Sequence, residues 1–316
     1  MHYKNIRNMK TYMKIISPIT NKDNVTKIKT VDASWIIRQW KRQYSYDVSY
    51  LFKGCNIIEL FRCDETGYLF FKPDVEGDSK LYEHLQNFSW YYMPWKWEHE
   101  VAVRYLKEDM HILEIGCAEG DFLDRVRKTY RLNVAGIETN SKAIKRAREK
   151  GLTVYEEIIE KHSLNNALQY DIICTFQVLE HISNVKSFID ACLTCLKSEG
   201  ILILSVPNNL SFISEYDYIL NMPPHHSGLW NEYSLQRISS FFGMTVESIY
   251  KEPLQEYHKD IFKSTIYTKV FGIAYKNRVS RKLLQLLLLT PFIDKHVEYF
   301  SKWISGHTII AVYRKK

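Results

Sequence analysis

The sequence predicts an α/β protein with a mostly parallel sheet. From His111 onward, short apolar runs alternate with stretches whose apolar residues recur every three or four positions. This alternation is typical of β-α-β units, in which each helix returns the chain to the same edge of a sheet. The composition, 46% hydrophobic and 25% charged, is that of a folded globular protein. A chain of 316 residues is long enough for one large domain or two modest ones.

The apolar runs predict seven strands. Five alternate with helical patterns: His111–Ile115, Asn133–Ile137, Thr153–Tyr155, Asp171–Phe176 and Ile201–Val206. The helical patterns between them are Gly120–Thr129, Ser141–Lys150 and Val185–Lys197. Gly151 and Gly200 stand where helices commonly end in glycine. Two further runs, Met244–Tyr250 and Thr308–Tyr313, are expected to extend the same sheet.

The rest of the chain is less regular. The whole chain divides into a basic, aromatic-rich region at 1–90, a ligand-binding core at 91–253, a helical insertion at 254–303 and a final strand at 304–316. Upstream of residue 101 only a helix over Trp95–Lys107 is assigned.

Charge is distributed unevenly along the chain. Residues 1–53 hold 11 Lys and Arg against 3 Asp and Glu, residues 54–253 hold 20 against 29, and residues 254–316 hold 12 against 4. One interpretation is that the acidic middle acts on a small molecule while the basic arms face an anionic partner or surface. The other is that the arms are solvated flanks.

Location is inferred from cysteines and apolar runs. The six cysteines lack the spacing of a disulfide framework, which indicates a reducing compartment, and we interpret the Cys192 and Cys195 pair as core residues. The first thirty residues lack the apolar segment of a signal peptide, and Leu283–Ile293 is too short to span a bilayer. A cytoplasmic location is therefore expected.

The first predicted strand leads into a ligand-binding turn. Its end reads Glu114-Ile115-Gly116-Cys117-Ala118-Glu119-Gly120, directly before a predicted helix. Glycines at such a turn let a ligand approach the backbone, and the helix start offers unpaired N–H groups. Glu138 ends the second strand, where an acidic side chain can accept hydrogen bonds from both hydroxyls of a ribose. Together these features predict an adenosine-containing ligand, unless Glu138 is simply an exposed carboxylate.

A longer series of motifs resembles the class I S-adenosylmethionine-dependent methyltransferases, and within them the small-molecule and glycan-type branch. The series comprises Glu114–Gly120, Glu138, Tyr170–Ile173, Gln177–Ile182, Val206–Asn208 and Gly306–Tyr313. The resemblance implies a Rossmann-like seven-stranded sheet of order 3-2-1-4-5-7-6, with residues 254–303 inserted before the last, antiparallel strand. Ala118 departs from the glycine usual in this loop.

The resemblance also implies a set of cofactor-binding residues. Glu114 and Gly116 would face the methionine end of S-adenosylmethionine, and Glu138 the ribose hydroxyls. Further contacts are implied for Cys117, Ala118, Gly120, Thr139, Glu157, Ile158, Gln177 and Tyr92. Of these, Tyr92 belongs to an aromatic run that either covers the cofactor and acceptor as a lid or packs on the sheet.

Histidines mark the expected acceptor side. Pro223-Pro224-His225-His226 resembles a loop of sugar-modifying members of the family. Imidazole is well suited to accept a hydroxyl proton near neutral pH, so His225, His226 and His181 are the candidate catalytic residues, with a structural role as the alternative for each. No metal is expected, on the argument that the adjacent side chains of Glu180 and His181 point in different directions.

The sequence thus predicts S-adenosylmethionine-dependent methyl transfer to a small hydroxylated acceptor, a free or lipid-linked sugar of a glycan or glycolipid precursor. The alternatives are an RNA or quinone-type methyltransferase, and an inactive cofactor-binding protein with a regulatory role. Nucleic acid is not the expected partner. The apolar run Val279–Leu289, with its basic flanks, either rests peripherally on the inner face of an anionic membrane or packs on protein. The sequence does not indicate an oligomeric state.

Overall fold

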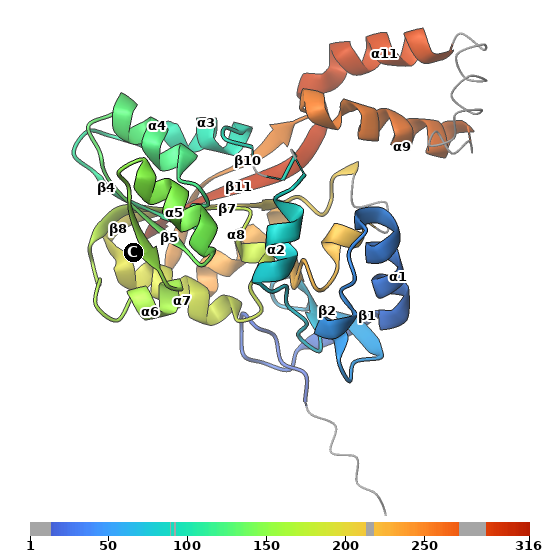
Figure 1. Ribbon diagram of the computed structural model, residues 1–316, viewed down its shortest axis with the longest axis horizontal. Coiled ribbons are helices and arrows are strands. Elements are labelled where there is room, and N and C mark those ends of the chain that lie inside the picture. The colour runs from blue at the N-terminus through green and yellow to red at the C-terminus, as the bar shows by residue number, and fades with distance from the viewer. Residues whose placement is uncertain (1–13, 89, 92, 213–217, 272–288) are drawn as a thin grey trace, which may run out of the picture.

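The computed structural model describes residues 14–88, 90–91, 93–212, 218–271 and 289–316. Within these ranges the chain forms two β-sheets with flanking helices, and a pair of helices that projects away from them (Figure 1). The larger sheet contains the predicted strands, and the smaller one is built mainly from the N-terminal region.

The larger sheet has the predicted topology. Its strands, in spatial order, are β6 (Thr153–Glu156), β5 (Asn133–Glu138), β4 (His111–Ile115), β7 (Tyr170–Phe176), β8 (Leu196–Pro207), β11 (Ser305–Lys315) and β10 (Met244–Pro253). Numbered along the core, this is the order 3-2-1-4-5-7-6. The last strand, β11, runs antiparallel to both of its neighbours, whereas β4 to β8 are parallel. The Rossmann-like methyltransferase fold is therefore confirmed.

Helices cover both faces of this sheet, and side chains fix where they begin. They are α3 (Trp97–Val103), α4 (Asp121–Thr129), α5 (Ser141–Glu149), α6 (Ile159–His162), α7 (Val185–Cys195) and α8 (Glu232–Ile238). The Asn140 side chain accepts hydrogen bonds from the first backbone N–H groups of α5, and Asn184 does the same for α7. Gly151, in the left-handed conformation, follows α5 as predicted.

The predicted bounds of two helices are wrong. The helix expected over Val185–Lys197 ends at Cys195, because Leu196 already pairs with Tyr170 as the first residue of β8. Gly200 accordingly lies inside that strand and ends no helix. The helix expected over Trp95–Lys107 is shorter at both ends and spans only Trp97–Val103.

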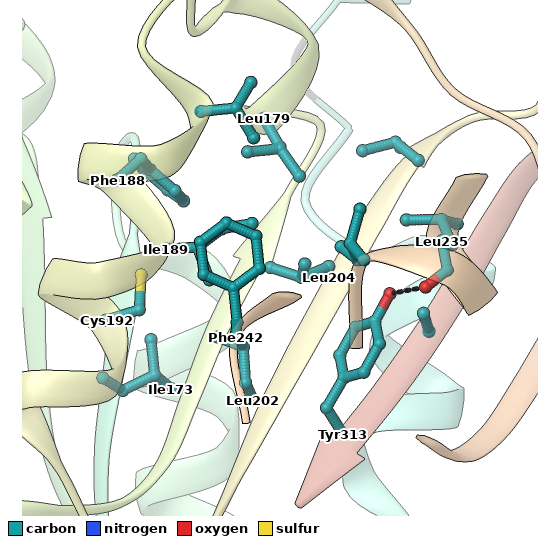
Figure 2. Packing of buried hydrophobic residues seen from close by; sticks show 14 of the residues in the cluster. Ile173, Leu179, Phe188, Ile189, Cys192, Leu202, Leu204, Leu235, Phe242 and Tyr313 are labelled. Carbon is teal, nitrogen blue, oxygen red and sulfur yellow. Dashed lines mark hydrogen bonds between the residues drawn. The ribbon is translucent and has the colours of Figure 1, made fainter. Parts of the chain in front are cut away.

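The hydrophobic core lies on both faces of the larger sheet, because side chains alternate between the two faces along each strand. Ile112 and Ile172 belong to one buried cluster, whereas their chain neighbours Leu113 and Ile173 belong to a second cluster. Successive side chains of a strand point to opposite faces, so both faces of the central strands are buried under helices. Figure 2 shows the second cluster, in which the buried Tyr313 hydroxyl donates a hydrogen bond to the Leu235 carbonyl at 2.8 Å.

The N-terminal region, which the sequence left unassigned, forms the smaller sheet. Its strands β1 (Val25–Asp32), β2 (Ile57–Cys63) and β3 (Leu69–Lys72) are antiparallel, and helices α1 (Ala33–Tyr44) and α2 (Ser79–Leu85) accompany them. The fourth strand, β9 (Gly228–Leu229), comes from the core region and pairs with β3. The two regions are therefore joined by backbone hydrogen bonds.

The insertion before the last strand is helical, as expected. Helices α9 (Lys259–Phe271) and α11 (Leu289–Phe300) pack against each other and extend away from both sheets (Figure 1). Of the apolar run Val279–Leu289, only Leu289 lies within the described residues. None of the helices described here is long and apolar enough to cross a membrane. Short 3-10 helices complete the fold at Ser49–Phe52, Leu179–His181, Ile219–Asn221, Ser239–Phe241, Glu256–His258 and Ser301–Trp303.

Candidate active site

A cavity of about 1140 Å³ lies at the carboxyl ends of the central strands. Strand register explains why functional residues gather there: Ile115 of β4 pairs with Ile137 of β5, and it also pairs with Thr175 of β7. The turns that follow these three strands therefore start at the same edge of the sheet. Parallel α/β sheets bind ligands at this edge.

The turn after β4 forms one wall of the cavity. Gly116 has a φ of +74°, and a Cβ at this position would meet Val178 Cγ2 at 2.5 Å, so only glycine fits. Ala118 also adopts a positive φ, 47°, which costs an alanine roughly 1–2 kcal/mol. Gly120, likewise left-handed, starts α4 and does not line the cavity. The turn thus exposes backbone to a ligand.

Glu138 is held at the end of β5 by backbone groups. Its Oε1 accepts hydrogen bonds from the N–H groups of Thr139, at 2.7 Å, and Asn140, at 2.9 Å. Its Oε2 accepts from the N–H of Ala118 at 3.0 Å, which ties the acid to the glycine turn. These contacts orient the carboxylate at the cavity wall, with lone pairs left for ligand hydroxyls.

Glu114 is a buried carboxyl group at the same end of the cavity. Its Oε2 has no hydrogen-bond partner in the described part of the chain. Burial raises the pKa of Glu114 to about 8, and the negative charges of Glu138 and Asp121 act in the same direction. A buried, unpaired carboxyl group is stabilised when a cationic group of a ligand reaches it. The residues present therefore fit a ligand that carries both a ribose and an ammonium group.

The remaining predicted cofactor residues are placed as follows. Cys117, Thr139, Glu157, Ile158 and Gln177 all line the cavity, whereas Tyr92 lies outside the described residues. The Glu157 carboxylate contacts the ring Nδ1 of His162 at 2.9 Å, so its side chain is already engaged. Gln177 has a positive φ of 56°, and its Nε2 donates a hydrogen bond to Ser205 Oγ at 3.1 Å.

The three predicted histidines form one cluster in the cavity wall, in which His225 and His226 are buried and His181 is partly buried. The ring centres of His181, His225 and His226 lie 4.5–5.0 Å apart. His181 Nδ1–H donates to the His225 carbonyl, and His225 Nδ1–H donates to the Leu220 carbonyl at 2.9 Å. Because a carbonyl only accepts, these bonds leave the lone pair of both rings on Nε2. His225 Nε2 accepts a hydrogen bond from the Tyr91 hydroxyl at 3.2 Å.

Electrostatics keep the cluster uncharged. Burial lowers the pKa of His181 to about 4 and lowers the pKa values of His225 and His226 well below the ordinary range. The mutual repulsion of the imidazoles adds to this effect at His225 and His226. Neutral imidazoles can accept protons or coordinate cations.

Buried carboxyl groups stand beside the histidines. Glu180 Oε1 lies 3.9 Å from His181 Nε2, so the expectation that these adjacent side chains point apart is wrong. The 3-10 turn Leu179–His181 brings both side chains toward the cavity. Burial raises the pKa of Glu180 to about 8. Sequence reasoning missed Glu98 and His99 of α3, which line the cavity and directly follow the aromatic run that ends in Trp97.

Comparison with known proteins identifies the family of the chain. The methyltransferase domain family matches residues 89–249, just over half of the chain. The chain belongs to this family. Its fold is that of a class I S-adenosylmethionine-dependent methyltransferase, and its cofactor is S-adenosylmethionine.

Individual relatives of this methyltransferase match over part of their length. A mitochondrial ubiquinone biosynthesis O-methyltransferase of Dictyostelium discoideum is 25% identical over 146 residues, 40% of this chain and 46% of that protein. A probable S-adenosylmethionine-dependent methyltransferase of Mycolicibacterium smegmatis is 28% identical over 158 residues, 48% and 60% of the two chains. The chain thus spans about half the length of these curated relatives.

Among solved structures, an S-adenosylmethionine-dependent methyltransferase from Archaeoglobus fulgidus aligns with a TM-score of 0.48 and 18% identity. The alignment covers 76% of this chain and 95% of the other.

Proposed function

We propose that the protein methylates a hydroxyl oxygen of a small acceptor, a sugar unit of a glycan or glycolipid precursor. The observation that carries the proposal is the cluster of neutral histidines, which shares a cavity with the cofactor-binding turn. The turn follows β4, Glu138 ends β5 on one side, and His181 follows β7 on the other side. The acceptor is therefore assigned to the histidine side of the turn.

Each group has a chemical task in this reaction. S-adenosylmethionine, when bound, supplies a methyl group activated by a positively charged sulfonium. Glu114 would hold the ammonium group of the cofactor and Glu138 its ribose. At the histidine cluster the acceptor hydroxyl would give up its proton to a neutral imidazole, and alignment of the acceptor oxygen with the methyl carbon would supply much of the rate.

A phenolic acceptor of the quinone type is the second candidate. Two observations favour it: several relatives are named ubiquinone biosynthesis O-methyltransferases, and Tyr82, Phe88, Trp90 and Tyr91 line the cavity. A phenol loses its proton with a pKa of about 10, well below that of a sugar hydroxyl, so it depends less on an imidazole base.

Transfer of a labelled methyl group separates the two candidates. The protein is incubated with methyl-labelled S-adenosylmethionine and either a set of glycosides and lipid-linked sugars or a set of catechols and hydroxylated benzoates. Label in a sugar ether supports the first proposal, and label in an aryl ether supports the second. If neither set nor a cell extract accepts label while S-adenosylhomocysteine still binds, methyl transfer is excluded as the activity.

We also propose that the projecting helical pair meets an anionic membrane, which would suit a lipid-linked acceptor. Tyr299 and Trp303 near the end of α11 are 69% and 71% exposed, and Lys295 and Lys302 lie close to them in sequence. Exposed aromatic rings with basic flanks favour a lipid interface. Flotation with anionic vesicles should be lost at high salt and in the double variant Tyr299→Glu, Trp303→Glu. No flotation of the unmodified protein would refute the proposal.

A further inference from the structure

The histidine cluster has the composition of a metal site. One ring nitrogen from each of His181, His225 and His226 lies within 4.8 Å of the other two. Three imidazoles bind zinc in one common type of catalytic site and leave a coordination position open for water or substrate. The cluster also lines the cavity, so an ion bound there would be accessible to an acceptor.

The hydrogen bonds around the cluster favour ligation. Metal-binding histidines typically donate their second ring N–H to a carbonyl or carboxylate, which fixes the tautomer and the ring orientation. His181 and His225 both do this through Nδ1, so their Nε2 atoms carry the lone pairs. At His225 an ion would displace the hydrogen bond from the Tyr91 hydroxyl. The loops that carry them are tied together, since Ser227 N–H donates to the Glu180 carbonyl at 2.8 Å and Ser227 Oγ donates to the His181 carbonyl at 3.2 Å.

Buried polar atoms without hydrogen-bond partners are an independent reason to expect a bound cation. Among the residues that the structure describes, His226 Nδ1 and Glu180 Oε2 are buried without a hydrogen-bond partner. His226 is 4% exposed and Glu180 is 1% exposed, so solvent cannot compensate. A buried polar group without a partner costs about 1–3 kcal/mol. His226 belongs to the cluster whose ring nitrogens lie within 4.8 Å of one another, and Glu180 lies beside that cluster, so a ligand bound there would reduce this cost. Lone pairs from imidazoles and a carboxylate are complementary to a cation.

We propose that His181, His225 and His226, with Glu180 beside them, bind a divalent transition-metal ion of the zinc type. At nitrogen distances of about 2.0–2.1 Å, ligand atoms of a tetrahedral ion stand about 3.4 Å apart. The ring nitrogens, now within 4.8 Å of one another, would therefore approach by up to about 1.4 Å when the ion binds. Imidazole ligands favour zinc, cobalt, nickel and iron over magnesium and calcium. With the ion bound, the three imidazoles are ligands rather than bases, so the ion would take over their role by binding the acceptor hydroxyl and easing loss of its proton to solvent; this role, unlike the binding itself, rests on the proposed methylation of a hydroxyl group.

The proposal is tested on the full chain, freed of metal and of any affinity tag, in a non-chelating reductant. Calorimetric titration with Zn²⁺ should show one equivalent bound at micromolar protein. X-ray absorption of the loaded protein should show imidazole nitrogens at about 2.0–2.1 Å. Uptake of no stoichiometric zinc would overturn the proposal. So would sulfur neighbours at about 2.3 Å, because these would assign binding to the free cysteines.

Variants identify the ligands. His225→Gln and His226→Gln should each weaken Zn²⁺ binding at least about a hundredfold, whereas His111→Gln, at an exposed position, should leave it unchanged. Melting temperature and S-adenosylhomocysteine affinity check that the variants are folded. If either variant fails to fold, X-ray absorption of the zinc-loaded, unmodified protein still shows whether imidazole nitrogens bind the ion. Equal binding by the folded variants would refute the proposal.

Failure of the metal-site proposal and failure of the proposed methyl transfer give different experimental results. Zinc binding without methyl transfer to any acceptor would support the metal site and remove its assigned role. Methyl transfer by metal-free protein at an unchanged rate in the presence of a chelator would leave the proposed function standing and refute that role.

Discussion

The two halves of the cavity are assembled differently. The cofactor half, Glu114–Glu119 with Glu138, comes from two neighbouring strands and the turns that follow them. The acceptor half, His181 with Glu180, Tyr91 and the loop of His225, joins segments up to 134 positions apart in the chain. The residues of the cofactor half therefore lie close together in the sequence. The acceptor half depends on the N-terminal region, because Tyr91 and strand β3 both contact the segment that carries His225.

The largest effect is expected at the acceptor half. His225→Asn and His226→Asn should each lower turnover about 10²- to 10⁴-fold, the usual contribution of a positioned acid or base, while S-adenosylhomocysteine affinity stays within about twofold. Steady-state rates and calorimetry measure the two quantities. His111→Asn, on the surface, is the control. A parallel loss of cofactor affinity would show that the two halves are not independent.

The next effect belongs to the cofactor half. Glu138→Ala should weaken S-adenosylhomocysteine binding tenfold to several hundredfold, since hydrogen bonds to a charged group contribute about 1.5–3 kcal/mol each. The ligand-induced rise in melting temperature should shrink accordingly. Glu149→Ala, in an exposed position on α5, should bind as the unmodified protein does. If Glu138→Ala kept full affinity, the ribose assignment would be wrong.

A pH effect should follow from Glu114. In the ligand-free protein its pKa is raised to about 8, and the cofactor ammonium requires the carboxylate form. Below pH 8, binding must therefore release a proton, and affinity should fall by up to about tenfold per pH unit. Calorimetry at pH 6.5 and 8 in buffers of different ionisation enthalpy would detect the proton.

The raised pKa of Glu114 affects folding stability in the opposite direction: a higher pH favours cofactor binding but lowers the stability of the ligand-free protein. Because the folded pKa exceeds the ordinary value of 4.5, ionisation of Glu114 should destabilise the ligand-free protein as the pH rises from about 4.5 through 8. Glu114→Gln should abolish the pH dependence of affinity and reduce that of stability, to which the buried Glu180, with its pKa also raised to about 8, contributes with the same sign. A pH-independent affinity in the unmodified protein would contradict the placement of the ammonium group.

The smallest effect concerns the strained turn. Ala118→Gly relieves a left-handed alanine but frees the unfolded chain, so the free energy of unfolding should rise by only about 0.5–1 kcal/mol. Urea unfolding measures it. The reverse sign is expected for Ala143→Gly inside helix α5, where glycine costs about 0.5–1 kcal/mol. Destabilisation by Ala118→Gly would show that the alanine methyl group contributes contacts that outweigh its strain.

Sequence was informative where function depends on local pattern. The turn after β4 and the acid that ends β5 follow from periodicity and a short motif, and the structure places them at one edge of the sheet. The strand order follows from the resemblance to the methyltransferase family, and the structure confirms it. The fourth strand of the smaller sheet was not predictable, because it is the two-residue segment Gly228–Leu229, which has no periodicity to detect. The contact between Glu180 and His181 was mispredicted because it depends on a 3-10 turn rather than on a strand.

Strand β9 has a consequence for how the protein is made. Gly228 packs against Tyr68 so closely that a Cβ there would meet the tyrosine hydroxyl at 1.7 Å, and it pairs with Phe70 across the smaller sheet. During synthesis, residues 25–72 leave the ribosome long before residue 228, so their sheet stays open on one edge meanwhile. An open edge is a site for unwanted pairing between chains. The step that closes it also seats His225 and His226, so protection of the nascent sheet and completion of the acceptor pocket coincide in time.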